Sequence, residues 1–194
     1  MSITAAPHQP VLADLIPGAR VRDATLVLAA TALLIVAGQV AIPLWFTPVP
    51  LSLATFAVLL SGAALGPARA ACSTGLYLLL GVAGAPIFAA QASGWAFASF
   101  GYIVGYVPAA VVVGWLARKR ADRTVLTTIA AAGLGSLLVY ACGLPWLVAH
   151  LDVDVATGLE FGVYPFLAGD AIKAAAAALL LPTAWQAVDR YSGR

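Results

Sequence analysis

The sequence contains very little charge. Only 9 % of its 194 residues are Asp, Glu, Lys or Arg and 62 % are apolar, against roughly 25 % and 45–50 % in soluble globular domains. No charged residue occurs in residues 24–68 or in residues 70–117. Each of these stretches can hold two helices that cross a bilayer, because one crossing needs about 20 residues. The composition therefore excludes a water-soluble fold and predicts an integral membrane protein.

Residues that serve catalysis, ATP binding or metal binding are also scarce. Cys72 and Cys142 both lie in apolar stretches and indicate neither a disulfide framework nor a zinc site. The only lysines are Lys119 and Lys173, and no G-x-x-x-x-G-K-[ST], H-E-x-x-H or G-x-S-x-G motif occurs. The net charge of +2 is too small for a nucleic-acid partner. We therefore expect no catalytic residue, no metal and no ATP site, so that any energy from ATP comes from a partner.

Proline and glycine divide the apolar sequence into predicted membrane-spanning helices. Pro43, Pro48 and Pro50 separate the first two helices, because proline lacks an N–H donor and disfavours helix in the preceding residue. A connection rich in Gly, Ser and Gln separates the third helix from the fourth. Pro145 predicts a kink or an early end in the fifth helix. The six predicted helices cover residues 24–42, 51–65, 70–82, 100–117, 125–149 and 166–188.

The predicted fold class is an all-α integral membrane protein with six transmembrane helices in contact with lipid. Residues 1–23 are predicted to form a cytoplasmic N-terminal lead-in, residues 24–188 a single membrane domain and residues 189–194 a cytoplasmic tail. The first apolar run lacks an A-x-A-type cleavage site. We therefore expect it to remain as the first helix and not to be removed as a signal peptide.

The positions of the basic residues predict the orientation of this domain. Nine of the ten Lys and Arg residues fall before the first helix, after the sixth, or in the second and fourth connections. The other connections, residues 43–50, 84–98 and 150–165, contain no Lys or Arg. Because cytoplasmic loops carry the excess of basic residues, we expect both termini in the cytoplasm and these three connections outside.

Asp170 and Lys173 are charged residues that the sixth helix cannot avoid. At a spacing of i, i+3 they share one helix face, so they can neutralise each other and still offer an acceptor and donors to a ligand. Asp170 lies in the first turn, where the helix dipole favours its charge. A salt bridge that only fixes helix packing is the alternative. The irregular segment 165–169 favours a ligand site, because non-helical backbone at membrane depth is tolerated where it lines a cavity.

The outer connections hold further candidates for a binding site. Gln91 and Ser93 offer neutral hydrogen-bonding groups that suit an uncharged polar ligand, with a plain exposed loop as the alternative. Trp45 either belongs to the aromatic belt at the membrane interface or lines a site. The alternating His and Asp residues of 150–154 lack a second cluster that would complete a metal site.

Small residues on the first helix predict a face for close helix packing. Thr25 and Ala29 are four residues apart, and small residues at this spacing let membrane helices approach closely. The neighbour is either another helix of this chain or a second membrane protein. The sequence leaves both possibilities open.

Four blocks of the sequence form a recognisable series. Residues 42–67 include Pro-Val-Pro-Leu-Ser-Leu-Ala-Thr-Phe, and residues 77–89 include Gly-Ala-Pro-Ile-Phe-Ala. Residues 101–106 read Gly-Tyr-Ile-Val-Gly-Tyr, and residues 165–174 read Pro-Phe-Leu-Ala-Gly-Asp-Ala-Ile-Lys-Ala. In this order, the blocks resemble the BioY family of biotin-specific S components of energy-coupling factor (ECF) transporters. The blocks extend from the first predicted helix to the sixth, and their combination is far more specific than any one of them.

The resemblance implies a six-helix S-component fold in the plasma membrane of a prokaryote. It implies that the chain captures biotin from outside the cell and is not an enzyme. Uptake would be powered by two cytoplasmic ATPases that are joined to the S component through a transmembrane coupling protein. The family's docking pattern of small residues on the first helix is imperfect here, because Leu28 stands four residues before Ala32. Docking is therefore expected at Thr25, Ala29 and Ala32.

The resemblance also implies that Asp170 and Lys173 are polar contacts to the vitamin. The ureido group of biotin has N–H donors for a carboxylate and a carbonyl acceptor for an ammonium, while its thiophane ring and chain suit an apolar pocket. Which end of biotin meets Lys173 is left open, as are a different vitamin and a membrane enzyme as alternative functions. The full set of expected binding residues is Asp170, Lys173, Gln91, Ser93, Tyr102, Trp45 and Thr47.

The sequence departs from the family pattern around the expected pocket. Ala54 stands where the family has glutamine before Thr-Phe, and Ala168 stands where it has proline before Gly-Asp. The outer connection between Phe88 and Gly101 is shorter and contains no arginine. A family contact of that type to the biotin carboxylate would have to come from Gln91, Ser93 or backbone donors instead.

Overall fold

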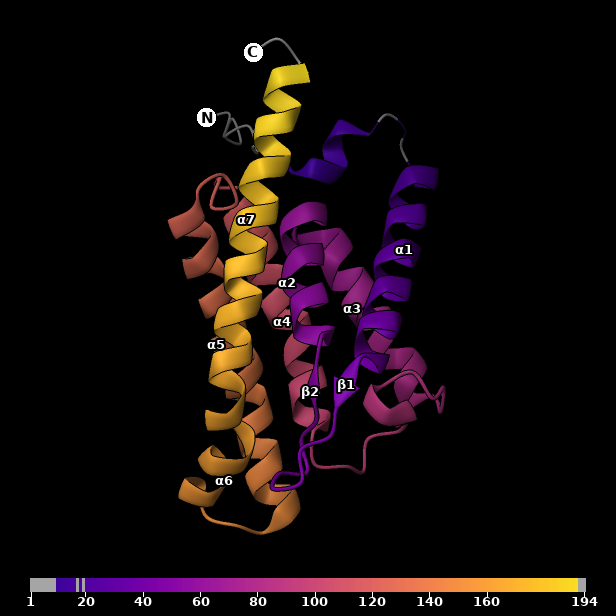
Figure 1. Cartoon of the computed structure of the whole chain (residues 1–194). Helices are drawn as coiled ribbons and strands as arrows, with labels where there is room; N and C mark the ends of the chain where they lie inside the picture. The colour runs from indigo at the N-terminus through magenta and orange to yellow at the C-terminus, as the bar shows by residue number, and fades with distance from the viewer. Residues whose placement is uncertain (1–9, 17, 19, 192–194) are drawn as a thin grey trace, which may run out of the picture.

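Figure 1 shows the computed structural model, which describes residues 10–16, 18 and 20–191 as a bundle of roughly parallel and antiparallel helices. The beginning of helix α1 (Arg20–Gln39) and the end of helix α7 (Leu167–Tyr191) lie at one end of the bundle, here called the terminal end. The short helix α6 (Val155–Gly162) lies at the opposite end, here called the α6 end.

The prediction of a six-helix, mostly helical protein is confirmed, with a helix at each of the six predicted positions. The other long helices are α4 (Phe100–Ala117) and α5 (Val125–Leu151), and the shorter ones are α2 (Ala54–Leu65) and α3 (Pro67–Val82). Three short 3₁₀ helices are η1 (Leu12–Leu15), η2 (Ala89–Gln91) and η3 (Tyr164–Phe166). Helices α1, α4 and α5 and the segment Val155–Tyr191 are long and apolar enough to cross a membrane. Helix α2 has 12 residues and α3 has 16, fewer than the roughly 20 of a full crossing.

The ends of several helices differ from the prediction. Helix α1 ends at Gln39, because residues 41–42 form strand β1 (Ala41–Ile42), which pairs antiparallel with β2 (Leu51–Ser52). Helix α5 continues through Pro145 to Leu151, so this proline does not end the helix. Helix α1 starts at Arg20 and α7 reaches Tyr191, so helix extends into both predicted polar ends. The parts of those ends at 1–9, 17, 19 and 192–194 lie outside the described residues.

Helix α6 was not predicted. It lies within the connection 150–165, and Asp154 begins it by accepting a hydrogen bond from the Thr157 N–H at 2.7 Å. This bond and other local hydrogen bonds hold the pKa of Asp154 below its ordinary value. The carboxylate that the sequence offered as a possible metal ligand is therefore a helix cap, the role for which Asp is strongly preferred.

Helix α4 is the central helix and packs against α2, α3 and α5. Its contact with the corner between α2 and α3 leaves no space for a side chain: a Cβ atom at Gly114 would lie 2.6 Å from the nitrogen of Pro67. Gly66 makes the corner itself and has a φ of +77°, a conformation that favours glycine. The two glycines thus allow the corner to lie directly against α4.

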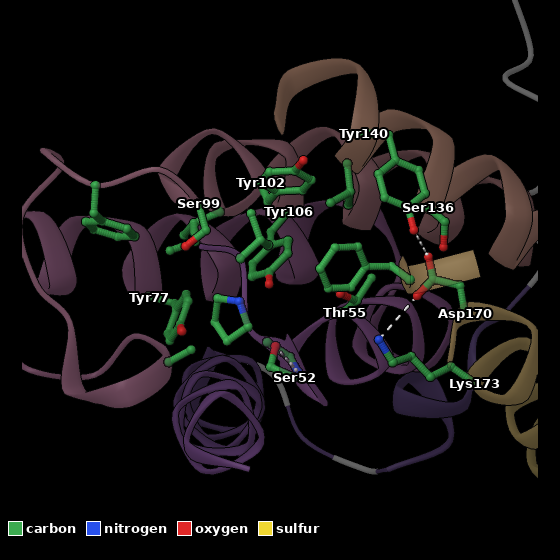
Figure 2. Close-up of a pocket in the computed structure, with 18 residues that line it drawn as sticks. Ser52, Thr55, Tyr77, Ser99, Tyr102, Tyr106, Ser136, Tyr140, Asp170 and Lys173 are labelled. Carbon is green, nitrogen blue, oxygen red and sulfur yellow. Dashed lines mark hydrogen bonds and ion pairs between the residues drawn. The ribbon is translucent and has the colours of Figure 1, made fainter. Parts of the chain in front are cut away.

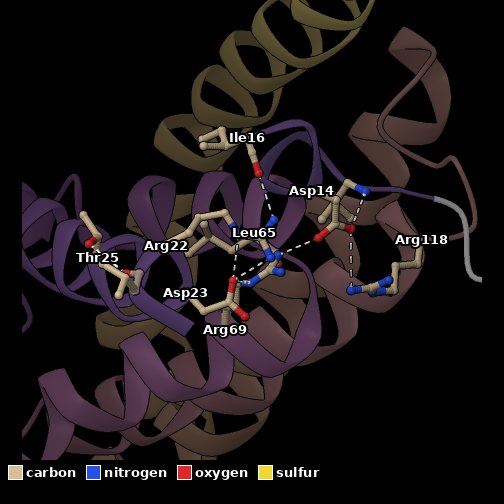
Figure 3. Close-up of polar contacts among 10 residues, drawn as sticks. Asp14, Ile16, Arg22, Asp23, Thr25, Leu65, Arg69 and Arg118 are labelled. Atoms are coloured by element: carbon tan, nitrogen blue, oxygen red, sulfur yellow. Dashed lines mark hydrogen bonds and ion pairs between the residues drawn. The ribbon is translucent and has the colours of Figure 1, made fainter. Parts of the chain in front are cut away.

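Charged residues at the terminal end form one network, shown in Figure 3. Asp14 of η1 accepts a hydrogen bond from Arg69 Nη1 at 2.8 Å and lies 3.8 Å from Arg118 Nη2. Arg69 Nε also lies 3.1 Å from Asp23 Oδ1. Next to this network the side chain of Val11 is completely buried. Ion pairs and apolar burial together therefore hold the N-terminal segment against the ends of α3 and α4.

A second polar contact at the terminal end joins α7 to the loop between α4 and α5. Trp185 Nε1 donates a hydrogen bond to Asp122 Oδ2 at 2.5 Å, and the Arg123 guanidinium lies 3.2 Å from the centre of the Trp185 ring. Asp122 is only 2 % exposed. Burial raises the pKa of Asp122, although the Trp185 hydrogen bond and the Arg123 charge act to lower it. The contact fixes the last turns of α7 relative to α4 and α5.

We expect loss of the Asp14 charge to release η1. Burial acts to raise the pKa of Asp14, but the hydrogen bonds from Arg69 and Val11 and the charges of Arg69 and Arg118 hold this pKa below 3.8. The ionised carboxylate therefore stabilises the fold above that pH, and the contribution is lost as the pH falls through the lower folded-state pKa. At pH 7, Asp14→Asn should speed amide hydrogen exchange in residues 11–16 about fivefold, equivalent to roughly 1 kcal/mol.

The control for this experiment is Asp152→Asn, a change at an exposed position at the α6 end. It should leave the exchange of residues 11–16 unchanged. The stability difference between wild type and Asp14→Asn should also vanish at a pH below the folded-state pKa of Asp14. Equal exchange rates in wild type and Asp14→Asn at pH 7 would contradict the role assigned to this network.

Candidate functional site

A cavity opens between the β1–β2 hairpin and helices α2, α3, α4, α5 and α7 (Figure 2). It encloses about 670 Å³ of space, a figure that includes the solvent in its open mouth. Most of the wall is aromatic or aliphatic, with polar groups in a few places. The polar lining residues are Ser52, Thr55, Ser99, Ser136, Asp170 and Lys173, and the aromatic ones are Tyr77, Phe97, Tyr102, Tyr106, Tyr140 and Phe166.

Asp170 and Lys173 form an ion pair at one end of this cavity. The Lys173 ammonium donates a hydrogen bond to Asp170 Oδ1 at 3.2 Å, and the Tyr140 hydroxyl donates one to Asp170 Oδ2 at 2.5 Å. The side chains of Asp170 and Lys173 are 14 % and 10 % exposed. Charged groups are costly inside a membrane protein unless they are paired. The pair therefore neutralises itself and still lies along the wall of the cavity.

Two further tyrosines contribute their rings to the wall and direct their hydroxyls to the backbone. Tyr102 donates to the Gly162 carbonyl at 2.9 Å, and Tyr77 donates to the Ile87 carbonyl at 3.3 Å. The hydroxyl of Tyr106 interacts with those of Ser52 and Thr55. The middle of the cavity is therefore largely aromatic surface, which suits an apolar ring system.

The hairpin and the 84–98 connection are attached to the bundle by side chain to backbone hydrogen bonds. Thr47 donates to the Phe161 carbonyl at 2.6 Å and so joins the hairpin to α6. Gln39 donates to the carbonyls of Ile87 and Phe88 at 3.0 and 2.9 Å. Trp146 of α5 donates to the Phe97 carbonyl at 2.9 Å. These bonds hold the covering segments in place around the cavity.

The structure brings together three of the seven predicted binding residues. Asp170, Lys173 and Tyr102 line the cavity, whereas the other four do not. Trp45 is 95 % exposed at the hairpin tip, and Thr47 is buried but bonded to α6. Gln91 and Ser93 of the outer connection are exposed, and Gln91 has a φ of +58°.

Residues that the sequence analysis did not select also line the polar end. Tyr140 and Ser136 lie four residues apart on α5, and both line the cavity. Residues at this spacing share one helix face. A polar pair on one face of an apolar span was the signal that could have identified them. Thr55, at the start of α2, lines the same end.

No group of three or more His, Cys, Asp or Glu side chains that could hold a metal ion occurs within 10–16, 18 and 20–191. Of the alternating residues at 150–154, His150 stacks on the Trp146 ring and Asp154 caps α6. Asp152 ends α5 in a left-handed conformation, with a φ of +53°. The side chains of His150 and Asp154 thus have local structural roles.

The predicted docking residues of the first helix lie on the outside of the bundle. Thr25, Ala29 and Ala32 are all exposed on α1. The Thr25 hydroxyl donates to the Val21 carbonyl at 2.9 Å, so its hydrogen-bonding capacity is satisfied within the helix. This face is therefore not used for packing against the described part of the chain. Of the two neighbours that the sequence left open, a second membrane protein remains.

The sequence of this chain is similar to that of known proteins of one family. The sequence profile of the BioY family matches residues 8–190. "Biotin transporter BioY" of Thermotoga maritima is 35 % identical over 153 residues, 77 % of this chain and 88 % of that protein. "Probable biotin transporter BioY" of Pyrococcus horikoshii is 33 % identical over 164 residues, 83 % of this chain and 94 % of that protein.

A solved structure is similar along most of the chain. The crystal structure of the S-component for biotin from an ECF-type ABC transporter matches with a TM-score of 0.77 and 25 % identity. The match covers 86 % of this chain and 92 % of that chain. Sequence and structure together show that this chain belongs to the BioY family.

Proposed function

We propose that this multi-pass membrane protein binds biotin as the S component of an ECF-type transporter. The observation that carries the proposal is the Asp170–Lys173 pair at the end of an otherwise aromatic cavity. Such a cavity can bind an apolar ring that carries a small group with both a donor and an acceptor. As a member of a family of transporters, the chain is a transport protein and not an enzyme.

The charges in the cavity favour one direction of binding. A ureido N–H would donate to Asp170 and the adjacent ureido carbonyl would accept from Lys173, because the two side-chain atoms lie only 3.2 Å apart. The second N–H would face the hydroxyls of Thr55 and Ser136. Because Asp170 already neutralises Lys173, the pair offers the biotin carboxylate no net attraction, and the valeryl chain would extend toward Ser99 and the outer connection.

The outer connection would meet the carboxylate without an arginine. Ala89 and Phe97 are the parts of this connection that line the cavity. Gln91 and Ser93 lie close to them in sequence and are exposed, so they are the side chains of this segment that could approach a ligand at the mouth. We propose Trp45 and Thr47 as parts of the cover: Thr47 fixes the hairpin to α6, and Trp45 lies at the hairpin tip.

Energy for uptake would come from other subunits. A transmembrane coupling protein with two cytoplasmic ATPases would dock on the α1 face that contains Thr25, Ala29 and Ala32, because this exposed face offers small side chains to a neighbouring helix. In the plasma membrane of a prokaryote, the terminal end would face the cytoplasm. The Arg69 and Arg118 network at this end supports that orientation.

Biotin binding by the purified protein tests the site. Asp170→Asn should lower the affinity for biotin at least about 100-fold, because it weakens the contact to the ureido N–H and leaves Lys173 without a charged partner. Isothermal titration calorimetry in detergent measures this effect, and excess desthiobiotin should compete while other vitamins should not. Glu160→Gln, an exposed change at the α6 end, serves as the control. Wild-type affinity in Asp170→Asn would contradict the assigned site.

Substitution of the α1 face tests the docking proposal. Ala29→Trp should abolish association with the coupling protein and lower ATP-driven biotin uptake in proteoliposomes more than tenfold, because the indole prevents close helix contact. Biotin binding by the isolated subunit should not change, since Ala29 does not line the cavity. The matched control, Leu79→Trp, places the same ring on the exposed surface of α3 and should leave uptake intact. Full uptake by Ala29→Trp would show that docking occurs elsewhere.

A further inference from the structure

Tyr140 holds Asp170 from a different helix than Lys173 does. The Tyr140 hydroxyl on α5 donates to Asp170 Oδ2 at 2.5 Å, while Lys173, on the same helix as Asp170, donates to Oδ1 at 3.2 Å (Figure 2). Each carboxylate oxygen therefore has one donor. Together the two bonds fix the rotation of the carboxylate in the cavity wall.

The two donors differ in rigidity. Lys173 ends a flexible chain and has three equivalent donors, so its bond alone does not fix the rotation of the carboxylate. Tyr140 has a rigid ring, which packs against the Tyr102 ring in a T-shaped arrangement with a centroid distance of 6.3 Å and an interplanar angle of 90°. Tyr140 thus places a donor at a defined point in the cavity wall.

Resting on the proposed function, we infer that Tyr140 is a positioning residue that sets the specificity of the site for a ligand with adjacent N–H and C=O groups. With Oδ2 engaged by Tyr140, Oδ1 is the oxygen presented beside the Lys173 ammonium. One acceptor and one donor then lie side by side, which complements a cyclic urea. A ligand in which oxygen replaces that N–H places an acceptor against Oδ1, so it loses this hydrogen bond and affinity with it.

A purely structural role for Tyr140 makes a different prediction. If its hydroxyl only joins α5 to α7, its removal should weaken the binding of every ligand of this cavity by the same factor. If it orients Asp170, its removal should weaken only those ligands that donate an N–H to Asp170. Comparison of ligands therefore separates the two roles, whereas stability or biotin affinity alone does not.

The experiment measures the affinities of wild type and Tyr140→Phe for biotin and for the two oxazolidinone analogues in which oxygen replaces one or the other ureido N–H. The analogue that binds the wild type more weakly lacks the N–H that meets Asp170. Tyr140→Phe should lower the affinities for biotin and for the other analogue about ten- to 100-fold, the range expected when a ligand N–H loses its hydrogen bond to the charged Asp170 carboxylate. It should change the affinity for the analogue that lacks this N–H less than threefold.

Tyr164→Phe is the matched control, because this tyrosine is exposed and lies outside the cavity lining. It should leave all three affinities unchanged. If Tyr140→Phe is not monodisperse in detergent, Tyr140→Met removes the same hydroxyl and keeps an apolar side chain. Equal losses for all three ligands, or no loss for biotin, would overturn the positioning role. Absence of biotin binding by the wild type would overturn the proposed function itself, and this inference with it.

Discussion

The site depends on one constraint, which is that a carboxylate and an ammonium buried in a membrane domain must be neutralised. Asp170 and Lys173 satisfy it together, and Tyr140 completes the coordination of the carboxylate. The three groups come from only two helices, so the relative position of α5 and α7 decides whether the cluster exists. The other helices supply the aromatic wall of the cavity and hold these two helices in place.

The two ends of the bundle are held by different forces. At the terminal end, ion pairs of Asp14 and Arg69 attach the N-terminal segment, and the Trp185 hydrogen bond to Asp122 anchors the last turns of α7. Toward the α6 end, neutral hydrogen bonds from Thr47 and Tyr102 to backbone carbonyls hold the hairpin and α6 around the cavity. Neutral bonds to the backbone cover the ligand space without adding charge to it, so the ligand meets a single charged pair.

The sequence predicted the long helices and the charged pair for clear physical reasons. Stretches without charge have to be buried or in lipid, and Asp170 with Lys173 had to fall inside the last of them. Tyr140 was missed because its partner is 30 residues away in sequence, and only packing of α5 on α7 brings the two together.

Local structure in the connections was predicted less well. Helix α6 is short, and its signal, the Asp154 cap with Thr157, looks the same in a loop. Gln91 and Thr47 were chosen for their chemistry, but backbone geometry decides where a loop side chain points. Gln91 lies outside the cavity lining, and Thr47 bonds to α6. Resemblance to a family indicated Asp170 and Lys173, which line the cavity, but not which residues of the outer connections face it.

The central claim is that the Asp170–Lys173 pair recognises the ureido group of biotin. A structure of the protein with biotin bound tests it most directly. The account predicts the ureido ring at this pair, with one N–H within hydrogen-bonding distance of Asp170 Oδ1, the carbonyl facing Lys173, and the valeryl chain directed toward Ser99. A biotin carboxylate bound to Lys173, or biotin bound away from the pair, would contradict it.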